Sequence, residues 1–204
     1  VKEGRGEKAI LVGDVMYDAY LYFANKINPY ETLNDFGLLH DKYILATIHR
    51  AENTDNPRYL NNIFSSLKNI STDTHIILPL HPRTKKMVEK FNISLEGIDI
   101  IDPVSYKTMI SLLSNACLVI TDSGGLQKES YFAKVPCITI RDETEWIETL
   151  ENGWNRLVSP NDCNTIKNTI ERLLQLDFTD KTYLESYGKG NAATKIIDTL
   201  VNLS

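Results

Sequence analysis

The sequence contains no long hydrophobic run, no cluster of basic residues and few cysteines. No apolar stretch approaches the roughly 20 residues that a membrane-spanning helix needs, so we expect no membrane segment. The first residues, Val1–Glu7, lack the apolar core of a signal peptide, and the absence of an initiator Met fits a processed or excised piece. The net charge of −5, without any run of Lys or Arg, argues against nucleic acid as a partner.

The three cysteines, Cys117, Cys137 and Cys163, lie far apart in the sequence. No two of them have the spacing of a metal-binding pair, and two sit in apolar runs. We therefore expect no metal site and predict buried, reduced thiols in a cytoplasmic protein. With 204 residues, 42% of them hydrophobic, the chain can form one solid domain with a buried core and some extra chain.

Short β-rich runs alternate with helical patterns through most of the chain. Apolar residues from Leu60 to Ile70 recur at three- and four-residue intervals, which predicts an amphipathic helix. Ser105 is predicted to cap a second helix. Ser159, which is followed by Pro160, is predicted to cap a third helix. Strands are predicted at residues 42–48, 75–79, 98–101, 117–121, 135–140 and 156–158. Apolar strands that alternate with helices indicate an α/β fold, a Rossmann-like parallel sheet with helices on both faces.

The two ends of the chain differ from this alternation. We predict a strand edge at Ala9–Gly13, an aromatic helix from Asp14 to Lys26 and an interdomain connector after it. A last helix, about Asn191 to Leu203, is expected to pack toward a domain outside this chain. The expected parts are residues 1–41, a nucleotide-binding domain at 42–188, and a C-terminal helix at 189–204.

Polar residues directly follow four of the predicted strands. In open α/β sheets, ligands bind at the carboxyl ends of the strands, so these residues should converge on one edge. Each group is weak evidence by itself, and their shared placement predicts a ligand site. The groups are His49–Asn53, His81–Arg83, Asp122–Gly125 and Arg141–Glu143.

Ser123, Gly124 and Gly125 join a strand directly to a helix. Two glycines let the backbone approach a ligand closely, and a helix start offers unpaired N–H groups at its positive end. The turn therefore fits a diphosphate cradle, and a tight turn whose glycines serve packing alone is the alternative. Glu129 falls one helical turn further on the same face, where a carboxylate could accept hydrogen bonds from both hydroxyls of a ribose. A solvated surface Glu is the alternative there.

Two histidines stand at the predicted ligand edge. His49 follows a buried strand and could transfer a proton or bind phosphate, or else bond structurally to a loop carbonyl. Arg50 beside it is expected to bind an anion or a structural carboxylate. His81 is also assigned to the ligand edge, because a His-Pro pair after an apolar strand fixes the turn. His40 and His75 lack such a context and are interpreted as structural.

Several segments resemble motifs of the non-hydrolysing UDP-N-acetylglucosamine 2-epimerases, in family order and with compatible spacing. Thr47–Asn53 resembles T-x-H-R-x-E-N, and Leu80–Pro82 contains the family's His-Pro pair. Thr121–Glu129 resembles T-D-S-G-G-x-Q-x-E, the most specific of these motifs. Arg141–Glu145 resembles R-D-x-T-E, and Gly13–Ala19 resembles G-N-T-V-I-D-A. The resemblance covers nearly the whole chain.

The resemblance implies one half of a two-domain, glycosyltransferase-B-like fold with the active site between the domains. It implies an isomerase that interconverts UDP-N-acetylglucosamine and UDP-N-acetylmannosamine by elimination and re-addition of UDP, without NAD or metal. The carboxylates that transfer protons in the family belong to the other, N-terminal half, so we expect the isolated chain to be inactive. We also expect a homodimer of the full-length protein, acting in polysaccharide biosynthesis.

The resemblance also implies roles for individual residues. His49 matches the active-site histidine, and Met109 stands where the family often has an aromatic residue beside the uracil. Trp146 stands where many members have Arg, and the segment around it looks like a subgroup that includes UDP-2,3-diacetamido-2,3-dideoxyglucuronate 2-epimerases. Two other interpretations stay open, a UDP-sugar glycosyltransferase or hydrolysing 2-epimerase, and a non-catalytic nucleotide-sugar binding module. The expected substrate-binding residues are Arg50, Glu52, His81, Met109, Ser123, Gly124, Gly125, Glu129 and Arg141.

Overall fold

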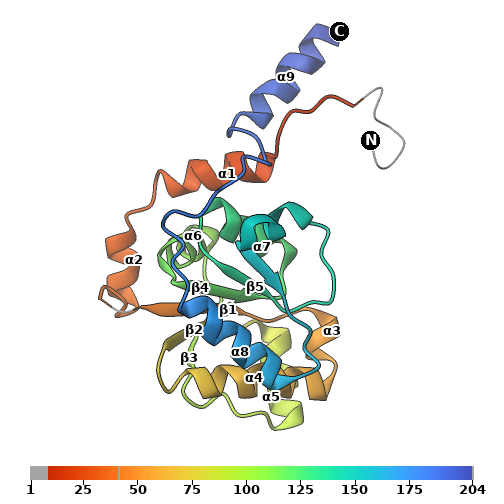
Figure 1. The fold of residues 1–204 in the computed structure, drawn as a ribbon. Coiled ribbons are helices and arrows are strands. Elements are labelled where there is room, and N and C mark those ends of the chain that lie inside the picture. Colours follow the sequence, from red (N-terminus) through yellow and green to blue (C-terminus); the bar gives the residue numbers. More distant parts are fainter. Residues whose placement is uncertain (1–8, 41, 204) are drawn as a thin grey trace. The chain divides into compact units, whose positions relative to one another are not determined.

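The computed structural model describes residues 9–40 and 42–203, apart from the side chains of Asn152 and Leu203 (Figure 1). The start of the chain, Val1–Glu7, where we expect no signal-peptide core, lies outside the described residues. The described residues within 27–183 form one compact unit, and those within 1–26 and 184–204 form another. The segment predicted as a connector, residues 27–41, thus falls in the same unit as the sheet. None of the described helices combines the length and apolar character needed to cross a membrane.

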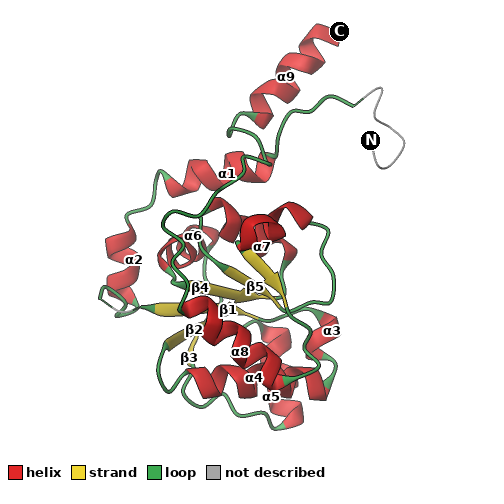
Figure 2. Ribbon diagram, viewed as in Figure 1, coloured by secondary structure: helices red, strands yellow, loops and turns green. Residues whose placement is uncertain are grey.

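The larger unit is built around a six-stranded parallel sheet with the order β3-β2-β1-β4-β5-β6 (Figure 2). In the register of the central strands, Ile44 lies beside Ile76 on one side and beside Leu118 on the other. Each of the six predicted strands is confirmed, with ends that shift by a few residues. The strands are β1 (Tyr43–Thr47), β2 (His75–Pro79), β3 (Asp99–Ile101), β4 (Leu118–Thr121), β5 (Cys137–Thr139) and β6 (Asn155–Leu157).

Helices cover both faces of this sheet, as the α/β pattern predicts (Figure 1). Because side chains alternate along a strand, Ile44 and Ala46 of β1 join one core cluster while Tyr43 and Leu45 join the other. The first cluster is packed by α4 (Pro57–Ile70), α5 (Pro82–Phe91) and α8 (Cys163–Leu174). The second is packed by α2 (Pro29–Asp35), α6 (Tyr106–Asn115) and α7 (Gly124–Phe132). Three short elements were not expected: α2, which lies in the segment predicted as a connector, α3 (Ala51–Thr54) and the 3₁₀ helix η2 (Ile147–Gly153).

The helix starts test the capping predictions. Ser105 caps α6 as predicted, because its side chain accepts a hydrogen bond from the Thr108 amide. The predicted start of α8 at Ser159 is wrong, since the helix begins at Cys163 with Asp162 as its N-cap. The Asp162 carboxylate accepts from the Thr165 amide at 2.8 Å, whereas the Ser159 hydroxyl is used within the preceding turn by Asn161. A carboxylate is a stronger acceptor for helix N–H groups than a hydroxyl.

The smaller unit contains α1 (Val15–Ala24) and α9 (Ala192–Leu203), both close to their predicted bounds. The predicted strand at Ala9–Gly13 is wrong, since these residues form no strand and the side chains of Ile10 and Leu11 are exposed. No strand occurs among the described residues of this unit, so the segment has no partner for a backbone ladder. Asp18 accepts hydrogen bonds from the Ala192 and Ala193 amides, which places its charge at the positive end of α9.

The cysteines are all free thiols, but only Cys137 is fully buried. Burial raises the pKa of Cys137 to about 12, so this thiol stays protonated and unreactive. Cys117 and Cys163 are half-buried, which corrects the prediction that all three are buried. Burial also raises the pKa of Cys117.

Candidate functional site

The strand order reverses between β1 and β4, and the carboxyl ends of these two neighbours form the switch point of the sheet. Thr47 and Thr121 are paired there, and their hydroxyls are 2.7 Å apart. The segment after β1 leads into α3 and the segment after β4 leads into α7. The sheet thus brings the His49 and Ser123 segments together at the place where open α/β sheets bind ligands.

Asp122 joins the two segments. Its carboxylate is fully buried and accepts hydrogen bonds from the amides of His49 (3.1 Å to each oxygen) and Arg50 (2.9 Å). The Asn53 side-chain amide donates to the same carboxylate at 3.1 Å. The Nδ1 atom of the His49 ring lies 3.5 Å from Oδ1 of Asp122. The carboxylate therefore fixes the start of α3 and the histidine that precedes it.

Asp122 and Asn53 belong to the segments predicted to converge on the ligand edge, but the sequence analysis assigned neither of them a role. Asn53 also donates to the Ile140 carbonyl at 3.1 Å, so it ties the end of β5 to the same network. A signal was nevertheless present, because a carboxylate between a buried strand and a glycine turn must find donors if it is buried. The sequence could not show that these donors come from the segment that follows β1.

The α7 start has the form expected of an anion cradle. Ser123 is the N-cap residue, and its hydroxyl accepts from the Leu126 amide at 3.4 Å. A methyl group added at Gly124 would lie 3.1 Å from Nε1 of Trp146 and 3.7 Å from Nη1 of Arg141. The space that Gly124 leaves open is therefore bordered by two side-chain donors and by the free amides of the first helical turn.

The loop that carries Arg141 and Trp146 is fastened to α7. Arg141, whose side chain is only 9% exposed, forms hydrogen bonds of 3.0 and 2.9 Å with the Glu145 carboxylate. These bonds lower the pKa of Glu145 to about 2. The Gln127 side chain donates to Thr149 and accepts from Thr144, which fixes the same loop to the middle of α7.

Glu129 is buried, with 6% of its surface exposed, and is not the solvated surface Glu of the alternative interpretation. Burial raises its pKa, while a hydrogen bond with the Tyr106 side chain and the charge of Lys128 act in the opposite direction. Lys128 is also buried, and its ammonium lies 4.0 Å from the centre of the Trp146 ring. A buried carboxylate in the second turn of α7 is placed to receive hydroxyl donors from a ligand held at the start of this helix.

His81 lies beside His49, with ring centroids 5.6 Å apart. It is the N-cap of α5, where its Nδ1 accepts a hydrogen bond from the Arg83 amide at 3.1 Å. The Arg83 guanidinium forms two hydrogen bonds with Asp55 and a third with Thr54, so α5 is linked to α3. The two histidines are therefore brought together by contacts between the elements that follow β1 and β2.

The other residues predicted to bind the substrate have separate surroundings. Arg50 forms an ion pair with Glu52 at 3.4 Å. Glu52 and Arg141 line a cavity of about 410 Å³ at the same edge of the sheet, together with Asp142, Glu143 and others. Met109 is half-buried and packs against the core cluster shared by α6 and α7. The described residues contain no group of three His, Cys, Asp or Glu side chains that could hold a metal ion.

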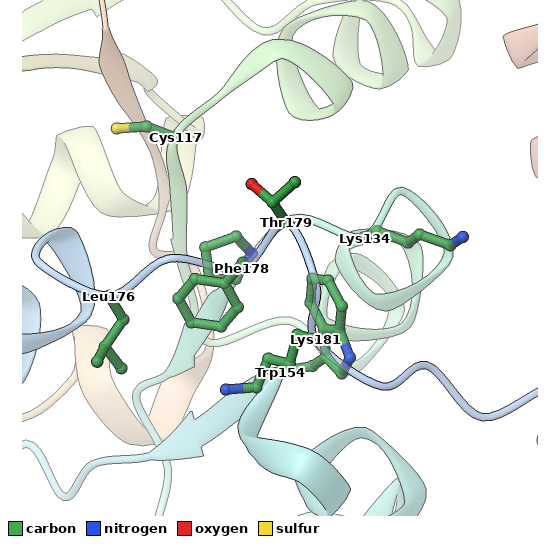
Figure 3. A pocket seen from close by; sticks show the side chains of 8 residues that line it. Cys117, Lys134, Trp154, Leu176, Phe178, Thr179 and Lys181 are labelled. Atoms are coloured by element: carbon green, nitrogen blue, oxygen red, sulfur yellow. The ribbon is translucent and has the colours of Figure 1, made fainter.

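A second hollow, of about 430 Å³, lies at the opposite edge of the sheet, where β4 and β5 begin (Figure 3). Trp154 and Phe178 form its aromatic wall, with ring centroids 5.5 Å apart. The Trp154 indole donates to the Thr182 carbonyl at 2.8 Å, so the aromatic residues hold the chain segment that follows α8. None of the predicted site residues lines this hollow.

Comparison with known proteins finds relatives among the UDP-sugar 2-epimerases. A Methanococcus maripaludis protein described as a UDP-N-acetylglucosamine 2-epimerase homolog is 41% identical over 98% of this chain and 57% of its own length. The Pseudomonas aeruginosa UDP-2,3-diacetamido-2,3-dideoxy-D-glucuronate 2-epimerase is also 41% identical, over 98% of this chain and 55% of its own length. The crystal structure of the Methanocaldococcus jannaschii UDP-GlcNAc 2-epimerase with UDP-GlcNAc and UDP has a TM-score of 0.86 and 36% identity, covering 98% of this chain and 57% of that one.

The chain spans little more than half the length of these relatives. The sheet order, the helices on both faces and the match to these structures confirm the expected glycosyltransferase-B-like half. The family model described as UDP-N-acetylglucosamine 2-epimerase matches residues 1–201. The chain therefore belongs to the UDP-N-acetylglucosamine 2-epimerase family.

Proposed function

We propose that this chain is the UDP-binding half of a non-hydrolysing UDP-N-acetylglucosamine 2-epimerase. The observation that carries the proposal is the buried Asp122 carboxylate, which joins the His49 segment to the Ser123–Gly125 turn at the switch point. The same residues match the family's motifs, and a family member of known structure binds UDP and UDP-GlcNAc. An isolated carboxylate, histidine or glycine turn would not support this function.

The geometry and the resemblance to the family's motifs together support the following proposed roles. The free amides of Gly124 and Gly125 and the Arg141 guanidinium bind the diphosphate, and Glu129 accepts hydrogen bonds from the ribose. His49 is the proton-transfer group on this side of the cleft. The further substrate contacts come from Ser123 at the turn and from Arg50, Glu52, His81 and Met109.

The proposed reaction conserves atoms and charge. The proton at C2 of the sugar is removed while the bond from C1 to UDP breaks, which gives a 2-acetamidoglucal and free UDP. UDP then adds back at C1 while C2 receives a proton on the opposite face. Part of the proton-transfer machinery belongs to the rest of the full-length enzyme. Exposed apolar side chains on α9, Ile197, Leu200 and Val201, support packing of this helix against that part.

A second candidate substrate is UDP-2,3-diacetamido-2,3-dideoxyglucuronate. The relative that carries this activity in its name is as similar to this chain as the N-acetylglucosamine epimerase homolog, at 41% identity. Both substrates contain the UDP that the α7 turn is proposed to bind. Competition between the two nucleotide sugars for the full-length enzyme would separate the candidates.

Titration of the chain with UDP tests the nucleotide site. We expect a Kd in the micromolar to millimolar range, about −8 to −4 kcal/mol, and loss of binding in the Ser123→Ala/Glu129→Ala double variant. Glu171→Ala is the matched control, because Glu171 lies on α8 and pairs only with Lys167 among the described residues. If Glu171→Ala weakens binding as much as Glu129→Ala alone, Glu129 does not bind the ribose.

We also expect the isolated chain to lack epimerase activity, because half of the proposed cleft is absent. The measurement is exchange of the C2 proton of UDP-N-acetylglucosamine in deuterated buffer, followed by NMR. The full-length enzyme should exchange this proton, and the isolated chain should not. Exchange by the isolated chain would show that its own residues suffice for the proton transfer.

A further inference from the structure

The histidine pair at the switch point has different partners on equivalent ring atoms. The rings of His49 and His81 have centroids 5.6 Å apart and planes inclined by 35°. In each ring the Nδ1 atom faces a fixed group of the protein, a carboxylate for His49 and a backbone amide for His81. A neutral imidazole carries one proton, and the partner of one nitrogen decides which nitrogen holds it.

In His49, Nδ1 lies 3.5 Å from Oδ1 of the Asp122 carboxylate. Both oxygens of this carboxylate accept hydrogen bonds from the amide donors of His49, Arg50 and Asn53, so the group acts as an acceptor in this network. A lone pair on Nδ1 would be repelled by the carboxylate oxygen, whereas an N–H group is attracted to it. The neutral ring of His49 is therefore protonated on Nδ1, and its lone pair is on Nε2.

In His81, the hydrogen-bonding role of Nδ1 is reversed. Its Nδ1 accepts the hydrogen bond of the Arg83 amide, so this atom carries the lone pair and the proton is on Nε2. Pro82 at the first helical position and the contacts of Arg83 with Asp55 hold this N-cap arrangement in place. The side chain cannot turn its N–H toward the helix without losing the cap.

We propose that His49 and His81 are held in opposite tautomers, so that one presents a hydrogen-bond acceptor and the other a donor to the same ligand. Asp122 is the positioning residue that sets the tautomer of His49. Among the described residues, none forms a hydrogen bond with Nε2 of either ring, and the His49 side chain is 39% exposed. Only the identity of the ligand depends on the proposed function. If the ligand is a nucleotide sugar, the lone pair on Nε2 of His49 would face a proton of the ligand. The N–H group on Nε2 of His81 would face one of its oxygen atoms.

Nitrogen-15 NMR of the histidine rings tests the tautomers in the free chain. At about pH 8.5, where ordinary imidazoles are neutral, long-range proton–nitrogen spectra distinguish a protonated nitrogen from one with a lone pair. His49→Gln and His81→Gln assign the two signals. We expect the Nδ1–H pattern for His49 and the Nε2–H pattern for His81. An Nε2–H pattern for His49 in the wild-type chain overturns the proposal without any need for a variant at Asp122.

Asp122→Asn then tests the positioning role. The amide can offer an oxygen or an N–H, so we expect His49 to lose its preference for Nδ1–H while His81 keeps its pattern. The matched control is Asp99→Asn, because the Asp99 carboxylate contacts Nε2 of a different histidine, His75. This control should alter only the His75 signal. An unchanged His49 pattern in folded Asp122→Asn contradicts the role of Asp122.

These spectra separate the inference from the proposed function, because they need no ligand. If the tautomers are opposite but UDP fails to bind in the titration, the proposed nucleotide site is wrong and the inference about the two histidine tautomers remains valid. If UDP binds and the tautomers are the same, the inference is wrong and the nucleotide site stands.

Discussion

Replacing Asp122 by alanine is expected to lower the free energy of unfolding by about 3–5 kcal/mol. The substitution leaves the amides of His49 and Arg50 and the Asn53 side chain without their acceptor in a region closed to solvent. Each buried donor without an acceptor costs roughly 1–3 kcal/mol. Urea unfolding of the isolated chain would measure the loss, which is a large part of the stability of an ordinary domain.

Asp99→Ala provides the comparison for this prediction. Asp99 also accepts from a histidine, but its side chain is 54% exposed and the pair lies at the edge of the sheet. Exposed ion pairs contribute at most about 1 kcal/mol, so the loss should be small. Equal losses for the two variants would mean that the Asp122 network is not closed to water in solution.

Gly124→Ala is expected to weaken UDP binding at least tenfold, or by about 1.4 kcal/mol, without unfolding the chain. The added methyl group would lie 3.1 Å from the Trp146 indole nitrogen, inside the space proposed for the diphosphate. Gly124 does not need a left-handed backbone, so alanine fits its position in α7. Calorimetric titration with UDP and a thermal melt of the same sample would measure both properties.

The opposite result is expected for Gly37→Ala. Gly37 has a φ of +68°, a conformation that costs a side-chain-bearing residue roughly 1 kcal/mol, and no atom lies within 4 Å of the added methyl group. This variant should lose stability and keep its affinity for UDP. Normal UDP binding by Gly124→Ala would show that the diphosphate does not bind at the α7 turn, whatever the behaviour of Gly37→Ala.

The sheet could be predicted from the sequence because its strands are buried on both faces. Runs such as Tyr43–Thr47 and Leu118–Thr121 are apolar at nearly every position, and this pattern is typical of central parallel strands. The convergence of the polar segments followed from the same inference, since carboxyl ends of parallel strands share one edge. The start of α8 was misplaced because Ser159 and Asp162 are both good caps, and only the folded chain shows which of them is used.

The contacts inside the site could not be predicted in the same way. Helical spacing placed Glu129 on the face of α7 that continues from the glycine turn, but its burial and its hydrogen bond with the Tyr106 side chain arise only in the folded chain. Asp122 was placed at the ligand edge without a role of its own, because its partners are set by the pairing of β1 with β4. A single sequence carries the local pattern of a strand and does not show which strand lies beside it.

The pairing of β1 with β4 also determines when the site can form. The His49 amide reaches a carboxylate 73 positions further along the chain, and β2, β3 and their helices lie between the two strands in sequence. Closure of so long a loop is slow compared with the formation of single helices and hairpins. The two halves of the sheet must therefore join before any ligand can bind at the switch point. A ligand that binds there selects completely folded molecules, and its binding energy adds to the stability of the whole unit.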